Sequence, residues 1–435
     1  MKIYLNILLS LLVCSGVYSY RILVYSPTVS RSHLISNSRI AETLAKAGHE
    51  VVLFLPQYER MPVTNETMLS KQILFEFSHT KFEDLMREYQ NIIFSEDQSY
   101  LAALGMLSMY RTLTDLCEEI VMNKEIMDKL RAFKFEVAIS EQLDLCGVGV
   151  SHLLGIESHI WLSSTPMMEQ VSYFAGVPTP LSYVPVSMEA DLPDKMTYWQ
   201  RFENIIAYAF SLGFHRYGST SHTKMFRKRF GADFPDLDTL AGSSPLVFIS
   251  SEEFIDFPRP ILHKTVYIGG LGLKNAKPLD SKFEQLMSIG KKGTVFVSLG
   301  SVVQTSAMPK SLKSTLFDAF TEFPDYCFIF KIDAKDTVSK ELAVNLKNVK
   351  LVEWAPQVDL FGHPNLRAFV THGGLNSLME ASYAGVPIVT IGMFADQMRN
   401  GRAAERNGYG VPLSKLNLTV PNIATALRTV LENKS

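Results

Sequence analysis

The sequence has no excess of basic residues, so it lacks the usual electrostatic feature of a nucleic-acid-binding protein. Of its 435 residues, 42 are Lys or Arg and 44 are Asp or Glu, which gives a formal net charge of −2. Proteins that bind nucleic acid usually carry surplus positive charge, because it offsets the phosphates. Hydrophobic residues make up 47% and charged residues 20% of the chain, as in folded soluble proteins. The composition excludes a disordered or collagen-like chain, and we expect no nucleic-acid partner.

Cysteine is scarce, which excludes a fold built on a disulfide framework. Four cysteines are present, and Cys14 lies in an N-terminal segment that we expect to be removed. Cys117, Cys146 and Cys327 then remain, an odd number scattered over a large chain. The sequence allows one disulfide and one free thiol at most, without indicating which two cysteines pair.

Long apolar runs are absent after the first twenty residues. Residues 1–19 combine a charged start at Lys2, a short apolar run, and Val17 and Ser19 before a plausible cut ahead of Tyr20. This is the layout of a secretory signal peptide, with a buried N-terminal helix as the alternative. No later stretch reaches the roughly 18 apolar residues needed to cross a bilayer.

The signal predicts entry into the secretory pathway, with the lumen of the endoplasmic reticulum as the expected location. Three Asn-x-Ser/Thr sites, at Asn65, Asn417 and Asn433, fit lumenal exposure. The sequence shows neither a membrane span nor a C-terminal retention tetrapeptide of the Lys-Asp-Glu-Leu type. A soluble or secreted form is therefore left open.

Short β-branched runs alternate with helical periodicity along most of the chain. Arg21–Tyr25, a helical pattern over 32–47 and a second apolar run at 50–55 form a strand–helix–strand unit. This order predicts a parallel sheet with buried strands. Further strands are expected at residues 135–139, 159–162, 246–250, 266–268, 294–299, 327–331, 349–352, 368–371 and 388–391. A glycine-rich stretch, 269–279, interrupts the pattern, so we expect two α/β domains, 20–268 and 280–435, joined by a linker.

Two short motifs look like cofactor sites but lack the required context. The Gly-Leu-Gly run at 270–272 follows a strand, but Asn275 replaces the third glycine of a dinucleotide-binding loop and Pro278 prevents a helix. Asp236 and Asp238 have the spacing of a metal–nucleotide ligand pair, but no further oxygen ligands accompany them. We expect a linker at the first motif, a solvated turn at the second, and no metal site.

The informative stretch is Trp354–Gln397. Residues 368–371 should form a buried strand, and His372, Gly373 and Gly374 a turn that opens a helix over 375–384. The start of such a helix favours an anion, because its N–H groups are unpaired and its dipole is positive there. Asn376 and Ser377 in the first turn could add hydrogen-bond donors to a phosphate, as could His372.

Other residues of this stretch suit the remaining parts of a sugar nucleotide. Glu380, one turn beyond Asn376 on the same helix face, can accept two hydrogen bonds from a ribose diol. Trp354 offers an aromatic plane for a base, and Asp396 and Gln397 offer groups for sugar hydroxyls. Each residue alone is more often a core Trp, a solvated acid or part of an ordinary turn. Together they predict a nucleotide-sugar site.

This stretch closely resembles the signature of the UDP-glycosyltransferases, specifically the animal UDP-glucuronosyltransferase group. The signature residues present are Trp354, Pro356, Gln357, His363, Pro364, Thr371, His372, Gly373, Gly374, Asn376, Glu380, Gly385, Pro387, Asp396 and Gln397. Val297–Ser301 also resembles the family's phosphate-side loop, whereas Gly392 stands where a proline is usual. The resemblance implies the GT-B fold, two facing Rossmann-like domains with mostly parallel sheets. The first domain should bind the acceptor and the second the UDP-sugar.

The resemblance also implies a role for each matching residue. Trp354 should stack on uracil, Gln357 should contact the ribose or the uracil edge, and Glu380 should bind the ribose. The diphosphate should lie against Ser301, His372, Gly374, Asn376 and Ser377. Asp396 and Gln397 should bind the transferred sugar. No metal is implied, since the helix dipole and side chains can neutralise the leaving diphosphate.

The catalytic base is expected in the first domain. His33 lies on the loop after the first strand, where α/β sheets bind ligands, and the family has its base histidine in the same Ser-His pair. By position alone it would more often be a polar helix-entry residue. An imidazole titrates near neutrality and needs a carboxylate to orient it. Glu141 follows the strand that supplies this carboxylate in the family, and Asp144 is the alternative.

Together, the motifs and the resemblance predict an inverting, metal-independent transfer of glucuronate or glucose from a UDP-sugar to a small lipophilic acceptor. Arg399, directly after the Asp-Gln-Met run, could pair with a glucuronate carboxylate or be an ordinary solvated arginine. Family members usually continue further and end in a membrane span, so an inactive truncated isoform that binds UDP-sugar is the alternative. A homo- or hetero-oligomer with related transferases is also left open.

Overall fold

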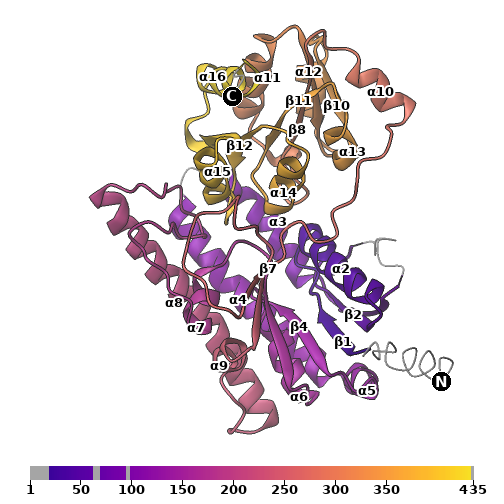
Figure 1. The fold of residues 1–435 in the computed structure, drawn as a ribbon, viewed down its shortest axis with the longest axis vertical. Helices are drawn as coiled ribbons and strands as arrows, with labels where there is room; N and C mark the ends of the chain where they lie inside the picture. Colours follow the sequence, from indigo (N-terminus) through magenta and orange to yellow (C-terminus); the bar gives the residue numbers. More distant parts are fainter. Residues whose placement is uncertain (1–18, 62–68, 95–97, 433–435) are drawn as a thin grey trace, which may run out of the picture.

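Two parallel β-sheets, each covered by helices, organise the chain (Figure 1). The structure, a computed structural model, describes residues 19–61, 69–94 and 98–432. The expected signal peptide, Asn65 and Asn433 lie outside these residues. Among the described residues, no helix combines the length and apolar character needed to cross a bilayer.

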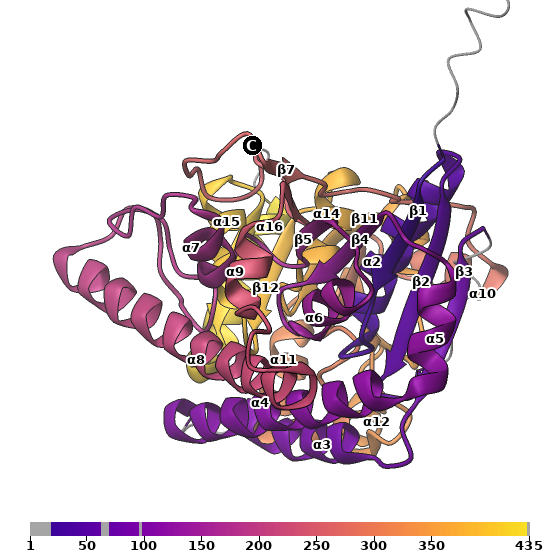
Figure 2. The same ribbon diagram turned by 90° about the horizontal axis from the view of Figure 1, so that it is seen from below.

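The first sheet is seven-stranded and has the order β3-β2-β1-β4-β5-β6-β7. Its strands are β1 (Arg21–Tyr25), β2 (Glu50–Gln57), β3 (Lys71–Glu76), β4 (Val137–Glu141), β5 (Ser158–Ser163), β6 (Leu246–Ile249) and β7 (Thr265–Tyr267). The helices around it are α2 (Arg31–Lys46), α3 (Lys81–Ile93), α4 (Gln98–Met122), α5 (Lys124–Ala132), α6 (Cys146–Leu153), α7 (Glu169–Ala175), α8 (Tyr198–Phe230) and α9 (Leu237–Gly242). The long helices α4 and α8 pack together along one side, and the N-terminal half of α8 extends away from the sheet (Figure 2).

The second sheet is six-stranded and has the order β10-β9-β8-β11-β12-β13. Its strands are β8 (Gly293–Ser298), β9 (Tyr326–Lys331), β10 (Val349–Val352), β11 (Leu366–Thr371), β12 (Ile388–Gly392) and β13 (Gly410–Ser414). The helices around it are α10 (Ser281–Met287), η1 (Thr305–Ala307), α11 (Lys310–Thr321), α12 (Thr337–Ala343), α13 (Gln357–Phe361), α14 (Leu375–Tyr383), α15 (Gln397–Arg406), η2 (Lys415–Asn417) and α16 (Val420–Glu432).

Every strand expected from the sequence is present, with ends shifted by two residues at most. The central strands β1, β8 and β11 are almost fully buried, as expected for parallel strands covered on both faces. β7, the last strand of the first sheet, ends at Tyr267, and α10 of the second domain begins at Ser281. The end of β4 matters for the site, because Ser140 and Glu141 were expected to follow the strand, whereas Glu141 is its last residue.

Cys117 and Cys146 form a disulfide that ties α4 to the start of α6, and Cys327 is a buried free thiol. One pair and one free thiol is the arrangement that the cysteine count allows. The Asp236 motif differs from the solvated turn that we expected. Asp236 caps the N-terminus of α9, and Asp238 is buried, with Oδ1 2.7 Å from Nε2 of His215. The cap made by Asp236 and the contacts of buried Asp238 with His215 and Arg216 explain this motif without a ligand.

The two domains face each other across an interface made mainly by α2, α3, α14 and α15 (Figure 1). On α3, the amide of Gln90 donates to the carbonyl oxygen of Val302 at 2.9 Å. The ring of Tyr89 packs edge-on against Phe394, and the Ile93 side chain joins the hydrophobic core of the second domain. The carboxyl ends of both parallel sheets meet at this interface, which is where such sheets bind ligands.

Candidate active site

His33 and Glu141 form the central ion pair of the first domain's half of the cleft. His33 lies in the first turn of α2, whose N-cap is Ser30, and Glu141 ends the neighbouring strand β4. Nδ1 of His33 lies 2.6 Å from Oε2 of Glu141. The Glu141 side chain is fully buried, whereas that of His33 keeps an exposed fraction of 15%. Since an ionised carboxylate only accepts, Nδ1 carries the proton and Nε2 is the ring nitrogen left to accept one.

Two further residues hold this pair, and neither was predicted from the sequence. The hydroxyl of Ser164, just beyond β5, donates to Oε2 of Glu141 at 3.0 Å and lies 3.1 Å from His33 Nδ1. The amide of Asn37 on α2 donates to the other oxygen, Oε1, of Glu141. A turn of α2 separates Asn37 from His33, so both point to the same strand end. That spacing is the one sequence signal that could have identified Asn37.

The surroundings of His33 raise its pKa. Burial by itself lowers the pKa, but the charge of Glu141 and its hydrogen bond outweigh burial, and the negative charge of Asp396 adds to them. The net pKa is above the ordinary value of 6.5. The contribution of Asp396 also shows that this residue of the second domain lies within electrostatic reach of His33.

Asp144, the alternative partner for His33, belongs to a different buried cluster. Its Oδ2 accepts from the hydroxyl of Tyr58 at 2.5 Å, and its Oδ1 lies 3.3 Å from Nε2 of His222. Burial raises the pKa of Tyr58, and the negative charge of Asp144 raises it further. Asp144 has its contacts there, and Glu141 is the carboxylate that contacts His33.

The turn between β11 and α14 is shaped by close packing around the ring of His372. A side chain on Gly374, the N-cap of α14, would place Cβ 2.4 Å from His372 Nε2, and one on Gly300 would place it 2.6 Å from Cε1. Only glycine fits at these two positions. Gly300 also has a φ of 85°, which favours glycine. Ser301 follows it as an exposed residue after β8.

His372 is neutral, and a lysine that the sequence did not reveal lies beside it. Burial lowers the pKa of His372 to about 4, with a further contribution from the charge of Lys331. Lys331, the last residue of β9, donates to the carbonyl oxygen of Gly300 at 3.1 Å. Burial and the positive charge of Arg31, from the first domain, lower the pKa of Lys331. Two cations, one from each domain, therefore lie near the turn.

Glu380 lies on α14 between two polar partners, one on each carboxylate oxygen. Its Oε2 accepts from the amide of Gln357 at 2.8 Å, and the same amide donates to Ser377 Oγ at 3.2 Å. Its Oε1 accepts from Nη2 of Arg39, a residue of α2, at 3.0 Å. The structure thus brings together Gln357, Ser377 and Glu380 as the sequence predicted, and adds Arg39 from the other domain.

Asn376, one turn before Glu380, also bridges the domains. Its amide donates to the carbonyl oxygen of Ser32 at 3.1 Å, and its Oδ1 accepts from the hydroxyl of Ser36 at 3.5 Å. Since Ser32 precedes His33, this contact places the ion pair of the first domain next to the helix start of the second.

The Asp396 and Gln397 pair lies at the start of α15. Oδ2 of Asp396 accepts from the amide of Asn400 at 2.8 Å, and burial raises the pKa of Asp396 above its ordinary value. Oε1 of Gln397 accepts from the backbone N–H groups of Met393 and Phe394 at 3.0 and 3.3 Å. The Gln397 carbonyl is therefore occupied, and its amide group is the part left for a ligand.

Trp354 lies at the outer edge of this group of residues. Its side chain is 59% exposed and meets the ring of Phe283 edge-on, with 6.5 Å between ring centroids. An exposed indole face is unusual for a residue that a folded protein normally buries, and it is available for stacking.

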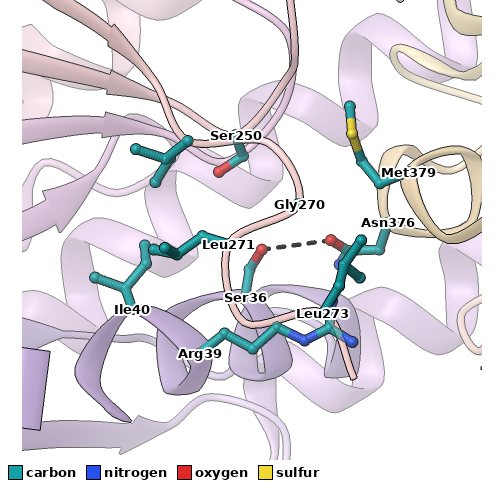
Figure 3. Close-up of a pocket in the computed structure, with 10 residues that line it drawn as sticks. Ser36, Arg39, Ile40, Ser250, Gly270, Leu271, Leu273, Asn376 and Met379 are labelled. Atoms are coloured by element: carbon teal, nitrogen blue, oxygen red, sulfur yellow. Dashed lines mark hydrogen bonds between the residues drawn. The ribbon is translucent and has the colours of Figure 1, made fainter. Parts of the chain in front are cut away.

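Two cavities lie beside α14, and Glu380 lines the second of them. One of about 20 Å³ lies between α2, the linker and α14, and Figure 3 shows Ser36, Arg39, Asn376 and Met379 around it. The other, of about 230 Å³, is lined by Glu380, Tyr383, Val358 and residues 273–276 of the linker. No group of three or more residues suited to holding a metal ion occurs in the described part of the chain.

Arg399 does not face the cleft, contrary to the proposed contact with a glucuronate carboxylate. Its side chain is 1% exposed, and Nη1 pairs with Oδ1 of Asp256 at 2.6 Å. Nε donates to the carbonyl oxygen of Pro185, and the guanidinium lies over the ring of Phe257. Arg399 is therefore buried in the interface between the two domains, where it contacts residues of the first domain.

The family model described as UDP-glucoronosyl and UDP-glucosyl transferase matches residues 21–435. The chain belongs to this family. The resemblance drawn from the signature is thereby confirmed, and the protein is a UDP-sugar-dependent glycosyltransferase.

Relatives in animals are similar over almost the whole chain. The Caenorhabditis elegans protein ugt-48, provisionally named a UDP-glucuronosyltransferase, is 38% identical over 421 residues, which cover 95% of this chain and 79% of the relative. Human UDP-glucuronosyltransferase 3A2 is 32% identical over 413 residues, 94% of this chain and 77% of the relative.

Solved structures confirm the fold. A Medicago truncatula glycosyltransferase, UGT71G1, solved with UDP-glucose, superimposes with a TM-score of 0.62 at 15% identity and covers 97% of this chain and 92% of its own. TcCGT1, solved with UDP, superimposes with a TM-score of 0.63 at 13% identity, over 96% and 91% of the two chains. The GT-B architecture predicted from the sequence, with two Rossmann-like domains, is correct.

Proposed function

We propose that the UDP-glycosyltransferase acts by an inverting mechanism with His33 as its general base. Nε2 of His33 takes the proton from the hydroxyl of a small lipophilic acceptor bound by the first domain. The acceptor oxygen attacks the anomeric carbon from the face opposite the UDP, and the bond to the diphosphate oxygen breaks with its electron pair. An α-linked donor becomes a β-glycoside.

Glu141 is proposed to orient this base and to stabilise the imidazolium that forms. The 2.6 Å contact between Nδ1 and Oε2 fixes the tautomer with the proton on Nδ1. General-base catalysis of this kind contributes about 10²–10⁴-fold in rate. The raised pKa of His33 suits a group that must hold the proton after the transfer.

The second domain is proposed to bind the UDP-sugar along the turn and α14. Trp354 stacks on uracil, Gln357 contacts the ribose or the uracil edge, and Glu380 binds the ribose. The diphosphate lies at the start of α14. Ser301, His372, Gly374, Asn376 and Ser377 contribute donors to it, and Lys331 adds positive charge. Asp396 and Gln397 contact the sugar. Helix N–H groups and cations at fixed positions stabilise a leaving diphosphate without reorganisation.

The observation that carries this proposal is the placement of the His33–Glu141 pair against α14. The Asn376 contact with Ser32 joins the base-bearing helix to the helix that starts at the phosphate-binding turn. Such positioning converts the reaction of two bound substrates into an effectively unimolecular step.

The test is UDP release by the purified protein, with UDP-glucuronate and then UDP-glucose, across a panel of phenols and other lipophilic alcohols. His33→Ala should lower kcat by about 10²–10⁴-fold. His49→Ala is the matched control, because His49 precedes β2 at the opposite end of the sheet. Equal turnover by the His33→Ala variant and the parent would disprove the base assignment, and the faster donor identifies the sugar.

A further inference from the structure

One face of α2 is fitted to α14 of the other domain. Ser32, Ser36 and Arg39 recur at helical spacing and therefore lie on one side of the helix. Asn376 contacts the backbone carbonyl oxygen of Ser32 and the hydroxyl of Ser36, and Glu380, one turn further along α14, contacts the side chain of Arg39. Figure 3 shows Ser36 and Arg39 directed at α14 across the small cavity. The two helices therefore meet along matched polar residues.

Arg39 and Glu380 are shielded from solvent at this contact. Their side chains are 15% and 11% exposed. Nε of Arg39 is buried and has no hydrogen-bond partner among the described residues. Burial of an ionised carboxylate is costly unless a cation and hydrogen bonds compensate it. Arg39 provides the cation and Gln357 an additional hydrogen bond.

The linker lies close against the stem of Arg39. A Cβ on Gly272, which has a φ of 69°, would lie 3.0 Å from Cβ of Arg39. Gly270, Leu271 and Leu273 line the same cavity. An arginine held at its stem presents its planar group in a defined direction, so less conformational entropy is lost for each hydrogen bond formed.

Glu380 has capacity left for a ligand. A carboxylate has about four lone-pair sites, and the structure occupies one on each oxygen, by Arg39 on Oε1 and by Gln357 on Oε2. The remaining sites can accept the two hydroxyls of a ribose. The 230 Å³ cavity that Glu380 lines offers space beside it.

We infer that Arg39, a residue of the acceptor-binding domain, determines specificity for the ribose of the donor by holding the carboxylate of Glu380 in a fixed orientation. The inference rests on the proposed role of Glu380. Arg39 lies on the same helix as His33, so the residue that supports ribose recognition is rigidly connected to the base. Binding of a complete ribonucleotide then favours the closed arrangement in which His33 faces the sugar.

A purely structural clamp is the competing explanation, and the chain contains a matched control. Arg402 on α15 pairs with Asp191 of the first domain through Nε and Oδ1 at 2.6 Å. This pair also crosses the interface, but it does not touch α14, Gln357 or Glu380. Loss of Arg402 therefore removes an interdomain ion pair without altering the carboxylate.

The experiment measures the dissociation constants of UDP and 2′-deoxy-UDP by calorimetry for the parent, Arg39→Met, Arg39→Lys, Arg402→Met and Glu380→Gln. The ratio of the two constants on one protein is unaffected by any unfolded fraction. The parent should prefer UDP by about ten- to hundredfold, the range for a hydrogen bond to a charged group. Arg39→Met should lower the preference to about threefold or less, Arg39→Lys should keep part of it, and Arg402→Met should keep all of it.

The inference is overturned if Arg39→Met keeps the parent's preference, or if Arg402→Met loses it equally. Glu380→Gln reports separately on the proposed function. If Glu380→Gln keeps the preference for UDP, Glu380 does not bind the ribose and the proposed function of this residue is wrong. If Glu380→Gln loses the preference while Arg39→Met keeps it, only the role of Arg39 is rejected.

Discussion

At the scale of single residues, the protonation of His33 sets how the enzyme should respond to pH. His33 must be neutral to act as the proposed base, and its pKa is raised by Glu141 against the effect of burial. We expect kcat/KM to increase with pH through a value above 6.5, the ordinary pKa of histidine. In Glu141→Gln the carboxylate charge is lost and burial dominates, so the midpoint should move to lower pH while the maximum rate falls by about 10²-fold or more.

The measurement is kcat/KM between pH 5 and 9 for the parent and Glu141→Gln. Glu136→Gln is the matched control, because Glu136 precedes the same strand but pairs with Arg21 on the surface. Superimposable profiles for the parent and Glu141→Gln would argue against the role of Glu141, whatever the absolute rates.

At the scale of helices and strands, the regular pattern of buried strands made the fold predictable. β1, β4, β8 and β11 are short apolar runs followed by polar or glycine-containing turns, so both the sheets and the ligand-binding strand ends follow from the sequence. β3 and β13 were missed. β3 alternates buried and exposed residues at the edge of its sheet, and β13 contains Pro412 on an edge.

The site was predictable to the extent that its residues follow one another in a motif. Gln357 and Glu380 were predicted because the family signature contains them in order, and Ser377 because it lies in the first turn of the expected helix. Arg39 and Ser164 were not, because their partners lie on other strands or in the other domain and come together only after folding. Arg399 was misinterpreted for the same reason: its position after the motif gave no sign of Asp256.

The disulfide between α4 and α6 makes a prediction about stability at this scale. Cys117 and Cys146 are 29 residues apart, and closing a loop of that length should stabilise the native protein by about 3–4 kcal/mol. The double variant Cys117→Ala/Cys146→Ala should lose this amount in urea unfolding. With reductant the parent should fall to the stability of the variant, within about 1 kcal/mol. Equal unfolding midpoints of the oxidised parent and the double variant would contradict the bond.

At the scale of the whole molecule, α15 joins the domains through three arginines. Arg399 pairs with Asp256, Arg402 with Asp191 and Arg406 with Asp194, each across the interface. The last two pairs are partly exposed, so each should contribute only about 1 kcal/mol or less and should weaken in salt. The Arg399 pair is buried, so the estimate for partly exposed pairs does not apply to its contribution to stability.

Removing one partner of the buried pair should lower the free energy of unfolding far more than removing both. Arg399→Met leaves Asp256 as an uncompensated buried charge, which typically costs about 3–5 kcal/mol, whereas Arg399→Met/Asp256→Leu should recover most of that loss. Urea unfolding of the parent, the two single variants and the double variant gives the coupling energy as a cycle. Additive single and double losses would show that the pair is not coupled.

The same variants decide whether Arg399 has any part in choosing the sugar. The guanidinium is enclosed by Asp256, Pro185 and Phe257, so it cannot reach a sugar carboxylate without opening the interface. We therefore expect the ratio of kcat/KM for UDP-glucuronate over UDP-glucose to stay within about twofold in the stable double variant, since no charge-assisted hydrogen bond to the sugar is lost. A selective loss of glucuronate transfer in the double variant would instead place Arg399 at the sugar and require the domains to open during the reaction. Kinetics of both donors, measured on the same preparation, separate these outcomes, because a general loosening of the interface lowers both rates together.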